Sequence, residues 1–151
     1  MVPKPTIFLL PGGMTHNTCF DRLLLYLKDY EVVVAAQPGA DAEDPNFHTA
    51  ESDSLAIQAE YLTPLLEAGK DVVIYTYSFG GTVLGTNGPS LVKSAREKRG
   101  EKGGVVGAVY MSVALVPAGV SQLEYLGGQW PGFIAVDSVS RQFRLPTKPP
   151  F

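Results

Sequence analysis

Residues 72–81, VVIYTYSFGG, decide the fold, because a β-branched apolar run ends in Ser78 and is followed by Phe79 and two glycines. Such a run is typical of a strand buried on both faces of a parallel sheet, and the small residues permit a sharp turn into a helix. This turn is expected to strain the backbone of Ser78, to expose its hydroxyl and to direct the next N–H at a reacting oxygen. The usual pattern is G-x-S-x-G, and Thr76 stands here in place of the first glycine.

The rest of the chain repeats the alternation of strand and helix. Apolar, β-branched runs predict strands at residues 6–10, 31–36, 72–77 and 105–112. Helical spacing of apolar residues predicts helices at about 19–29, at 51–68 with a kink at Pro64, and at 79–99 with a break near 87–89. The helix at 51–68 is predicted to bury Leu55, Ala59 and Leu62, among others. Because right-handed crossovers place helices on both faces, the predicted fold class is α/β, a doubly wound, mainly parallel sheet with an irregular C-terminal segment.

The composition fits one ordinary domain. The chain has 151 residues, 45% of them hydrophobic, and a formal net charge of -3. This charge gives no reason to expect nucleic acid, so the expected partner is a small molecule or another protein. Cys19 is the only cysteine, which excludes an internal disulfide and favours a reducing compartment. The apolar runs at 7–10 and 105–120 are too short or too interrupted for a signal peptide or a membrane span, so we expect a soluble cytoplasmic protein.

The loop after the first predicted strand, residues 11–17, begins with Pro-Gly-Gly. The carboxyl ends of parallel strands lie at one edge of a sheet, so this loop and Ser78 are expected to converge. Glycines at positions 12 and 13 would let the main chain approach a substrate closely. The alternative is that Pro-Gly-Gly forms only a turn.

Together, FLLPGG at 8–13 and YSFGG at 77–81 resemble the α/β-hydrolase superfamily, and within it the small esterase, methylesterase and hydroxynitrile-lyase-like branch. The likeness covers roughly residues 6–115. It implies that Ser78 is the nucleophile and that the N–H groups of Gly13 and Phe79 form the oxyanion hole, with Met14 as a second candidate for the first donor. The branch often serves in specialised metabolism, and the resemblance implies a small ester, thioester or lactone as substrate.

The sequence departs from the superfamily pattern after Ser78. In the superfamily the nucleophile is followed by an acid and then a histidine, but no histidine follows Ser78 here. The chain therefore resembles the N-terminal half of a hydrolase, truncated after the fourth core strand, with a core at 1–116 and a lid-like or irregular tail at 117–151. His16 is a candidate base because it lies in the loop beside the expected oxyanion hole, although loop histidines are usually solvated. His48, in the polar loop after the second strand, is less favoured.

The candidates for the acid follow the last predicted strand. Asp137 and Glu124 lie in the lid-like segment, and both can also be surface charges. No cofactor and no metal are expected, and a dinucleotide site in particular is disfavoured because the G-x-G-x-x-G pattern is absent.

Three interpretations of function remain open. The first is a serine hydrolase that uses Ser78. The second is a truncated, catalytically inactive relative that binds a ligand or a protein, or that is a gene remnant. The missing histidine favours this second interpretation. The third is assembly with a second chain or another copy, because the apolar strand at 105–112 would otherwise leave a sheet edge exposed.

Overall fold

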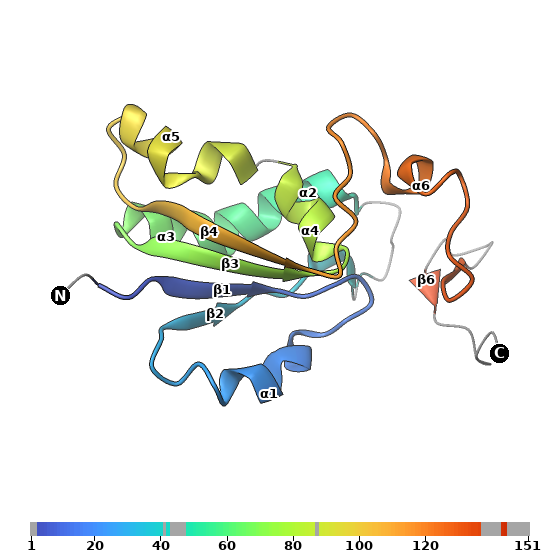
Figure 1. Cartoon of the computed structure of the whole chain (residues 1–151), viewed down its shortest axis with the longest axis horizontal. Coiled ribbons are helices and arrows are strands. Elements are labelled where there is room, and N and C mark those ends of the chain that lie inside the picture. Colours follow the sequence, from blue (N-terminus) through green and yellow to red (C-terminus); the bar gives the residue numbers. More distant parts are fainter. Residues whose placement is uncertain (1–2, 41, 43–47, 87, 137–142, 145–151) are drawn as a thin grey trace.

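The centre of the fold is a four-stranded parallel sheet with strand order β2-β1-β3-β4 (Figure 1). The computed structural model describes residues 3–40, 42, 48–86, 88–136 and 143–144. The strands are β1 (Thr6–Leu10), β2 (Val32–Val34), β3 (Asp71–Tyr77) and β4 (Gly104–Met111). The four predicted strands and their parallel arrangement are therefore confirmed, and β2 is shorter than predicted.

Helices lie on both faces of this sheet, which confirms the doubly wound α/β class. One face is covered by α2 (Ala50–Ile57), η4 (Gln58–Leu62), α3 (Thr63–Glu67) and α4 (Gly80–Gly85). On the other face lie η1 (Asn17–Phe20) and α1 (Asp21–Leu24). The Phe20 ring meets the Tyr75 ring edge-on at 5.9 Å, and Tyr75 points away from its buried neighbour Ile74 because successive strand residues face opposite sides.

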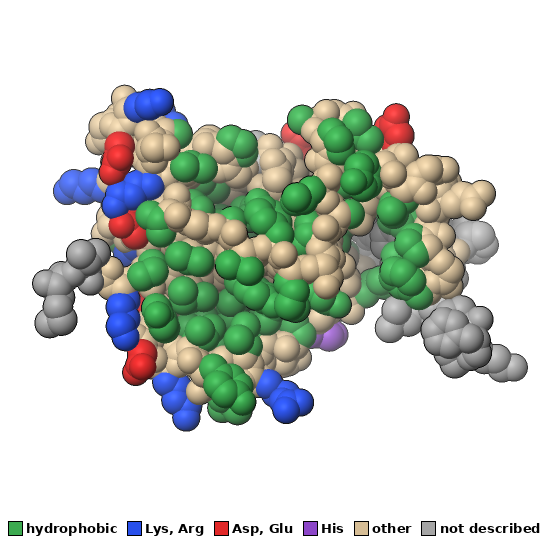
Figure 2. Space-filling model, in the orientation of Figure 1, with side chains coloured by type: hydrophobic (Ala, Val, Ile, Leu, Met, Phe, Trp, Pro, Cys, Tyr) green, Lys and Arg blue, Asp and Glu red, His purple; other side chains and the backbone are tan. Residues whose placement is uncertain are grey.

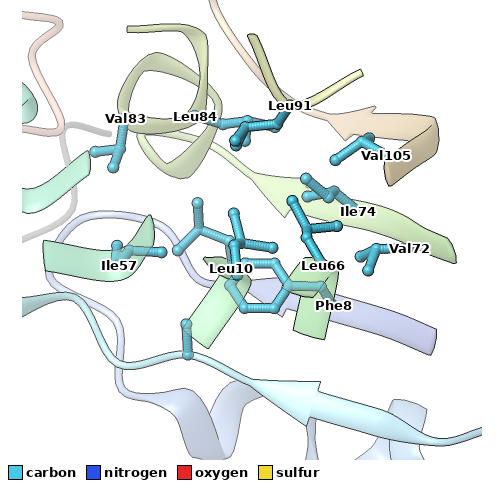
Figure 3. Packing of buried hydrophobic residues seen from close by; sticks show 12 residues of the cluster. Phe8, Leu10, Ile57, Leu66, Val72, Ile74, Val83, Leu84, Leu91 and Val105 are labelled. Carbon is cyan, nitrogen blue, oxygen red and sulfur yellow. The ribbon is translucent and has the colours of Figure 1, made fainter. Parts of the chain in front are cut away.

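The hydrophobic core lies between the sheet and the helices α2 to α4 (Figure 3). Phe8, Leu10 and Ile74 are at most 1% exposed. Their core neighbours are Ala35, Ile57, Leu62, Leu66, Val72, Val83, Leu84, Leu91 and Val105. Burial of a large apolar side chain stabilises a fold by about 1.5–3 kcal/mol. This core therefore fixes β3, the strand that leads to Ser78.

The helix predicted at 51–68 changes its pitch midway. α2 passes into the π-helical turn η4 before α3 begins, and Pro64 is the second residue of α3. Proline is tolerated there because the first turn of a helix does not need its N–H. The predicted burial of Leu62 is confirmed, but that of Leu55 and Ala59 is wrong. Leu55 is 55% exposed, because α2 turns Asp53 and Ser54 toward the interior instead.

The other two predicted helices are shorter or divided. The segment at 79–99 breaks into α4, η5 (Gly88–Leu91) and α5 (Lys93–Lys98), as the predicted interruption requires. The helix predicted at 19–29 ends at Leu24. Beyond it Leu25 and Tyr26 are 62% and 83% exposed, so no buried apolar face supports a longer helix there.

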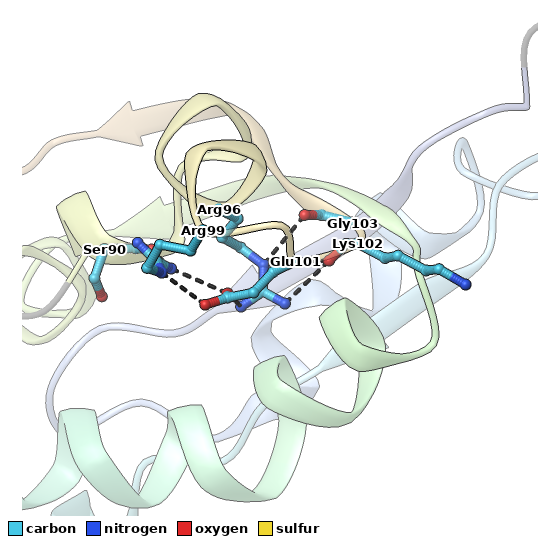
Figure 4. Close-up of polar contacts among 6 residues, drawn as sticks. All are labelled: Ser90, Arg96, Arg99, Glu101, Lys102 and Gly103. Atoms are coloured by element: carbon cyan, nitrogen blue, oxygen red, sulfur yellow. Dashed lines mark hydrogen bonds and ion pairs between the residues drawn. The ribbon is translucent and has the colours of Figure 1, made fainter.

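Two arginines attach α5 to the start of β4 (Figure 4). Arg96 donates to the carbonyl oxygens of Lys102 and Gly103 at 3.0 and 3.1 Å, and its guanidinium lies 2.8 Å from the Glu101 carboxylate. Arg99 donates to both carboxylate oxygens of Glu101 at 2.6 and 3.1 Å. These contacts hold the connection between α5 and β4.

After β4 the described chain forms short elements only. These are α6 (Gln122–Tyr125) and the antiparallel pair β5 (Ala135–Val136) and β6 (Phe143–Arg144). Within the residues that the structure describes, no helix combines the length and the apolar character needed to cross a bilayer.

Candidate active site

Ser78 lies at the sharp turn between β3 and α4. Its φ is 50°, in the left-handed region that an L-residue other than glycine rarely adopts. The turn is held from both sides, because the Ser78 N–H donates to the carbonyl of Met111 on β4 at 3.0 Å and its carbonyl accepts from the N–H of Gly81 at 3.1 Å. The residue is partly exposed. The strained, accessible serine predicted from the sequence is therefore present.

Two glycines allow α4 to begin directly after this turn. A Cβ at Gly80 would lie 2.6 Å from the Pro11 carbonyl oxygen and 2.8 Å from Thr76 Oγ1. At Gly81 a Cβ would lie 2.2 Å from a methyl group of Val113. Thr76, which replaces the usual first glycine, is fully buried next to Gly80, and its hydroxyl has no hydrogen-bond partner among the described residues. The side chain fits at position 76 because Gly80 has none.

The Pro-Gly-Gly loop lies against the same turn, as its place after β1 predicts. A Cβ at Gly12 would be 3.0 Å from Ser78 Cβ, and one at Gly13 would be 3.4 Å from Phe79 Cβ. The side chain of Gln37, which is buried, fixes the loop by donating to the Pro11 carbonyl at 2.6 Å. The two loops expected to converge at the carboxyl edge of the sheet do so.

Among the described residues, three that line a pocket together with Ser78 have unused backbone N–H groups. Within the described part of the chain, those of Gly13, Met14 and Phe79 donate no hydrogen bond to another protein group. Met14 also has a positive φ, 59°. Two fixed donors near a reacting carbonyl are what stabilisation of an oxyanion needs.

Ser78 opens into a pocket of about 580 Å³. The pocket is lined by Gly13, Met14, Thr15, His16, Gln37, Gly39, Ala40, Ala42, His48, Thr49, Ala50, Asp53, Ser78, Phe79, Gln122, Trp130 and Ile134. Both candidate bases, His16 and His48, thus face the same space as the serine. Of the candidate acids, Glu124 does not line the pocket, and Asp137 lies outside the described residues.

A pair formed by the partly exposed His48 and the buried Asp53 lines this pocket, and sequence reasoning missed it. His48 Nδ1 lies 3.1 Å from Asp53 Oδ1, and Asp53 Oδ2 accepts from the N–H of Gly39 at 3.2 Å. The sequence feature that could have predicted this pair is the start of α2, where Thr49 and Ser52 form a capping box. At such a helix start, the residue before the N-cap lies next to the fourth residue of the helix. Here these two residues are His48 and Asp53.

Cys19, the other nucleophilic side chain in this part of the molecule, is in a less favourable setting. Partial burial, followed by the nearby Asp21 carboxylate, raises the pKa of its thiol. A raised pKa lowers the thiolate fraction, and the thiolate is the reactive form.

The described residues also contain no group of three or more His, Cys, Asp or Glu side chains that could hold a metal ion.

A serine at the sharp turn after the third strand of a parallel sheet, beside a glycine loop after the first, is the arrangement typical of the α/β-hydrolase fold. In agreement, the profile of the Alpha/beta hydrolase family matches residues 7–150. The chain belongs to this family.

The relatives of the chain are distant and longer. It is 25% identical over 128 residues to "Probable hydrolase R7" of Phoma sp. (strain ATCC 20986 / MF5453), covering 83% of this chain and 49% of that protein. Among solved structures, a pyrethroid hydrolase from Sphingobium faniae JZ-2 superposes with a TM-score of 0.60 at 16% identity, over 94% of this chain and 56% of that one.

A second solved structure gives a similar result. An extracellular α/β-hydrolase from a Paenibacillus species, which shares homology with tobacco salicylic acid binding protein 2, superposes with a TM-score of 0.54 at 16% identity. The match covers 76% of this chain and 43% of that one. The chain thus spans about half the length of the relatives it matches, and the fold is a partial α/β-hydrolase fold.

Proposed function

We propose that the chain is a serine hydrolase that acts on a small, uncharged ester, thioester or lactone, with Ser78 as the nucleophile. The observation that carries the proposal is the strained Ser78 backbone, with φ of 50°, beside the Gly12-Gly13 loop at the wall of a 580 Å³ pocket. Such strain persists where the surrounding structure maintains it, and it is common at active sites. Family membership supports the reaction class.

In this mechanism Ser78 Oγ attacks the acyl carbonyl carbon. The carbonyl oxygen becomes an oxyanion that accepts from the N–H groups of Phe79 and of Gly13, or of Met14 in its place. Loss of one such donor lowers rates by about 10²–10³-fold in a serine hydrolase. The Ser78 hydroxyl gives up its proton, which ends on the oxygen or sulfur of the leaving alcohol or thiol as its bond to the acyl carbon breaks, and the acyl group stays on Ser78 Oγ.

The pocket lining supports an uncharged substrate. Its described walls include the apolar side chains of Ala40, Phe79, Trp130 and Ile134 and no Lys or Arg that would pair with an anionic acid group. A modest volume that combines apolar walls with a limited set of polar groups is typical of sites for small molecules. The single cysteine, Cys19, is the basis for proposing a reducing, cytoplasmic location.

A serine-reactive fluorophosphonate probe tests this function. We expect the folded chain to be labelled at Ser78, and Ser78→Ala to abolish labelling, with circular dichroism confirming that both proteins are folded. Labelling that persists in Ser78→Ala would assign the reaction to another residue.

The second candidate function is a catalytically silent module that binds a small molecule. It is favoured by one observation, a pocket of about 580 Å³ that has room for a small molecule whether or not Ser78 reacts. A folded chain that the probe does not label, but whose thermal unfolding midpoint rises with a small apolar ester or acid, supports this candidate over the hydrolase.

A further inference from the structure

The His48–Asp53 pair has the arrangement of a base and the group that orients it. Nδ1 of His48 faces an oxygen of Asp53 at 3.1 Å, and a carboxylate can only accept, so Nδ1 carries the proton. The lone pair is then on Nε2, the other ring nitrogen. An imidazole in this tautomer can accept a proton at Nε2.

The pair is held in place by its surroundings. The Asp53 side chain is only 5% exposed, and its second oxygen is occupied by the Gly39 N–H at 3.2 Å. The capping box at Thr49 and Ser52 fixes the start of α2, the helix that carries Asp53. The His48 side chain is 32% exposed, and it lines the pocket that holds Ser78. A buried carboxylate is therefore paired with an accessible imidazole that lines the same pocket as Ser78.

We propose that His48, oriented by Asp53, is the general base that activates water to hydrolyse the acyl group on Ser78. This inference rests on the proposed function. A base can act on a proton directly or through a positioned water, and a pocket of about 580 Å³ has room for a small acyl group and a water molecule.

The proposed step conserves every proton. His48 Nε2 takes a proton from water as the water oxygen bonds to the acyl carbon. The resulting oxyanion is held by the N–H groups described above. It collapses as the bond between the acyl carbon and Ser78 Oγ breaks, and the proton on Nε2 passes to that oxygen. The products are the free carboxylic acid and the Ser78 hydroxyl.

Burst kinetics with p-nitrophenyl acetate test this assignment on the full chain. This activated ester can acylate Ser78 with little help from a base, so the burst reports acylation and the later steady state reports deacylation. We expect His48→Gln to keep a burst of one equivalent and to lower the steady-state rate by about 10²–10⁴-fold, the usual effect of a general base. Asp53→Asn is expected to lower the same rate, because the imidazole loses the acceptor that fixes its tautomer.

The pH profile separates a base from a merely structural residue. The ionisable side chains that share the pocket with His48, among the described residues, are Asp53 on α2 and His16 in the loop after β1. The wild-type deacylation rate is expected to fall at low pH as the imidazole is protonated, and His48→Gln is expected to lack this fall. Since His48→Gln can also destabilise α2, His48→Ala with added imidazole is the second variant, in which imidazole is expected to restore turnover.

The outcomes distinguish this inference from the proposed function. If the wild type shows neither a burst nor an adduct on Ser78, the proposed function fails. If the wild type turns over and His48→Gln turns over equally, or if only His16→Gln slows turnover, the assignment to His48 is overturned while Ser78 remains the nucleophile. A wild-type burst without turnover overturns it as well, since no group then activates water.

Discussion

The backbone of Ser78 links fold and chemistry at the scale of a single residue. A left-handed conformation costs an L-residue about 1–2 kcal/mol, and here it is held by the bond from the Ser78 N–H to the Met111 carbonyl at 3.0 Å. Ser78 lines the same pocket as Gly13 and Phe79, whose N–H groups donate no hydrogen bond within the described residues. The fold thus bears local strain at the residue that is proposed to react.

This strain predicts an order of stability for two inactive variants. Ser78→Gly removes the Cβ that disfavours the left-handed region, whereas Ser78→Ala keeps it. We expect Ser78→Gly to be more stable than Ser78→Ala by roughly 0.5–1 kcal/mol, after the greater chain entropy of glycine is subtracted. Urea denaturation measures the difference, and a clearly more stable Ser78→Ala would show that position 78 is not strained.

At the scale of elements, α4 depends on its first glycine and not on its last. A Cβ at Gly80 would lie 2.6 Å from the Pro11 carbonyl, while one at Gly85 meets nothing within 4 Å. Gly80→Ala is expected to destabilise the chain by about 1–3 kcal/mol, the usual effect of overpacking, and to slow probe labelling by displacing the loop at Gly12. Gly85→Ala is the matched control on the same helix, and its stability is expected to be unchanged or higher. Equal stabilities, measured in urea, would contradict the proposed packing of α4 against the loop.

The connection between α5 and β4 predicts a dependence on pH. The hydrogen bond from Arg99, and then the charges of Arg99 and Arg96, hold the pKa of Glu101 below its ordinary value of 4.5. A carboxylate with a lowered pKa stabilises the fold above its unfolded-state pKa, and this contribution disappears as pH falls through the folded-state pKa. The effect is expected to be small because the carboxylate is exposed to solvent.

The variant Glu101→Gln isolates this contribution. Its urea midpoint is expected to be lower than that of the wild type at pH 7, and the difference is expected to close below about pH 4.5, as Glu101 becomes protonated. A difference that is constant from pH 7 to pH 3 would contradict the ionic origin of the contact.

At the scale of the whole molecule, the sheet ends in an apolar strand. Hydrophobic side chains gather over the sheet on the face shown in Figure 2. On β4, the outer strand, Val109 and Met111 are 49% and 44% exposed. The edge of β4 has only one further pairing among the described residues, a bridge from Val105 to Val92. An open edge with exposed apolar residues promotes association.

We therefore expect two copies of the chain to associate through β4. Static light scattering is expected to show a mass that rises with concentration, and Val109→Lys is expected to shift it toward the monomer. Leu25→Lys, at an exposed position beside α1, is the matched control and is expected to leave the mass unchanged. A monomer at all concentrations, or an equal effect of both variants, would contradict association through β4.

The sequence predicted much of the fold because its signals are local. The strands at β1, β3 and β4 are continuous apolar runs, and the turn at Ser78 follows from the small residues around it. The convergence of the Pro-Gly-Gly loop with Ser78 also followed, because parallel strands place their carboxyl ends at one edge.

The failures arose where tertiary contacts override local pattern. Helical periodicity predicted that Leu55 is buried. In the structure α2 instead buries the face that carries Asp53, which contacts His48 and Gly39, and Leu55 is exposed. The contact from Gln37 to Pro11 joins loops that are far apart in sequence, and no spacing rule predicts it. The His48–Asp53 pair could have been predicted from the capping box at Thr49.

The most direct test of the central claim is the mass of the chain after reaction with p-nitrophenyl acetate, quenched in acid within the first turnover. We predict one added acetyl group, located by peptide mapping on Ser78 and absent from Ser78→Ala. A folded wild-type chain that gains no acetyl group, or that carries it on another residue such as Cys19, would contradict the account.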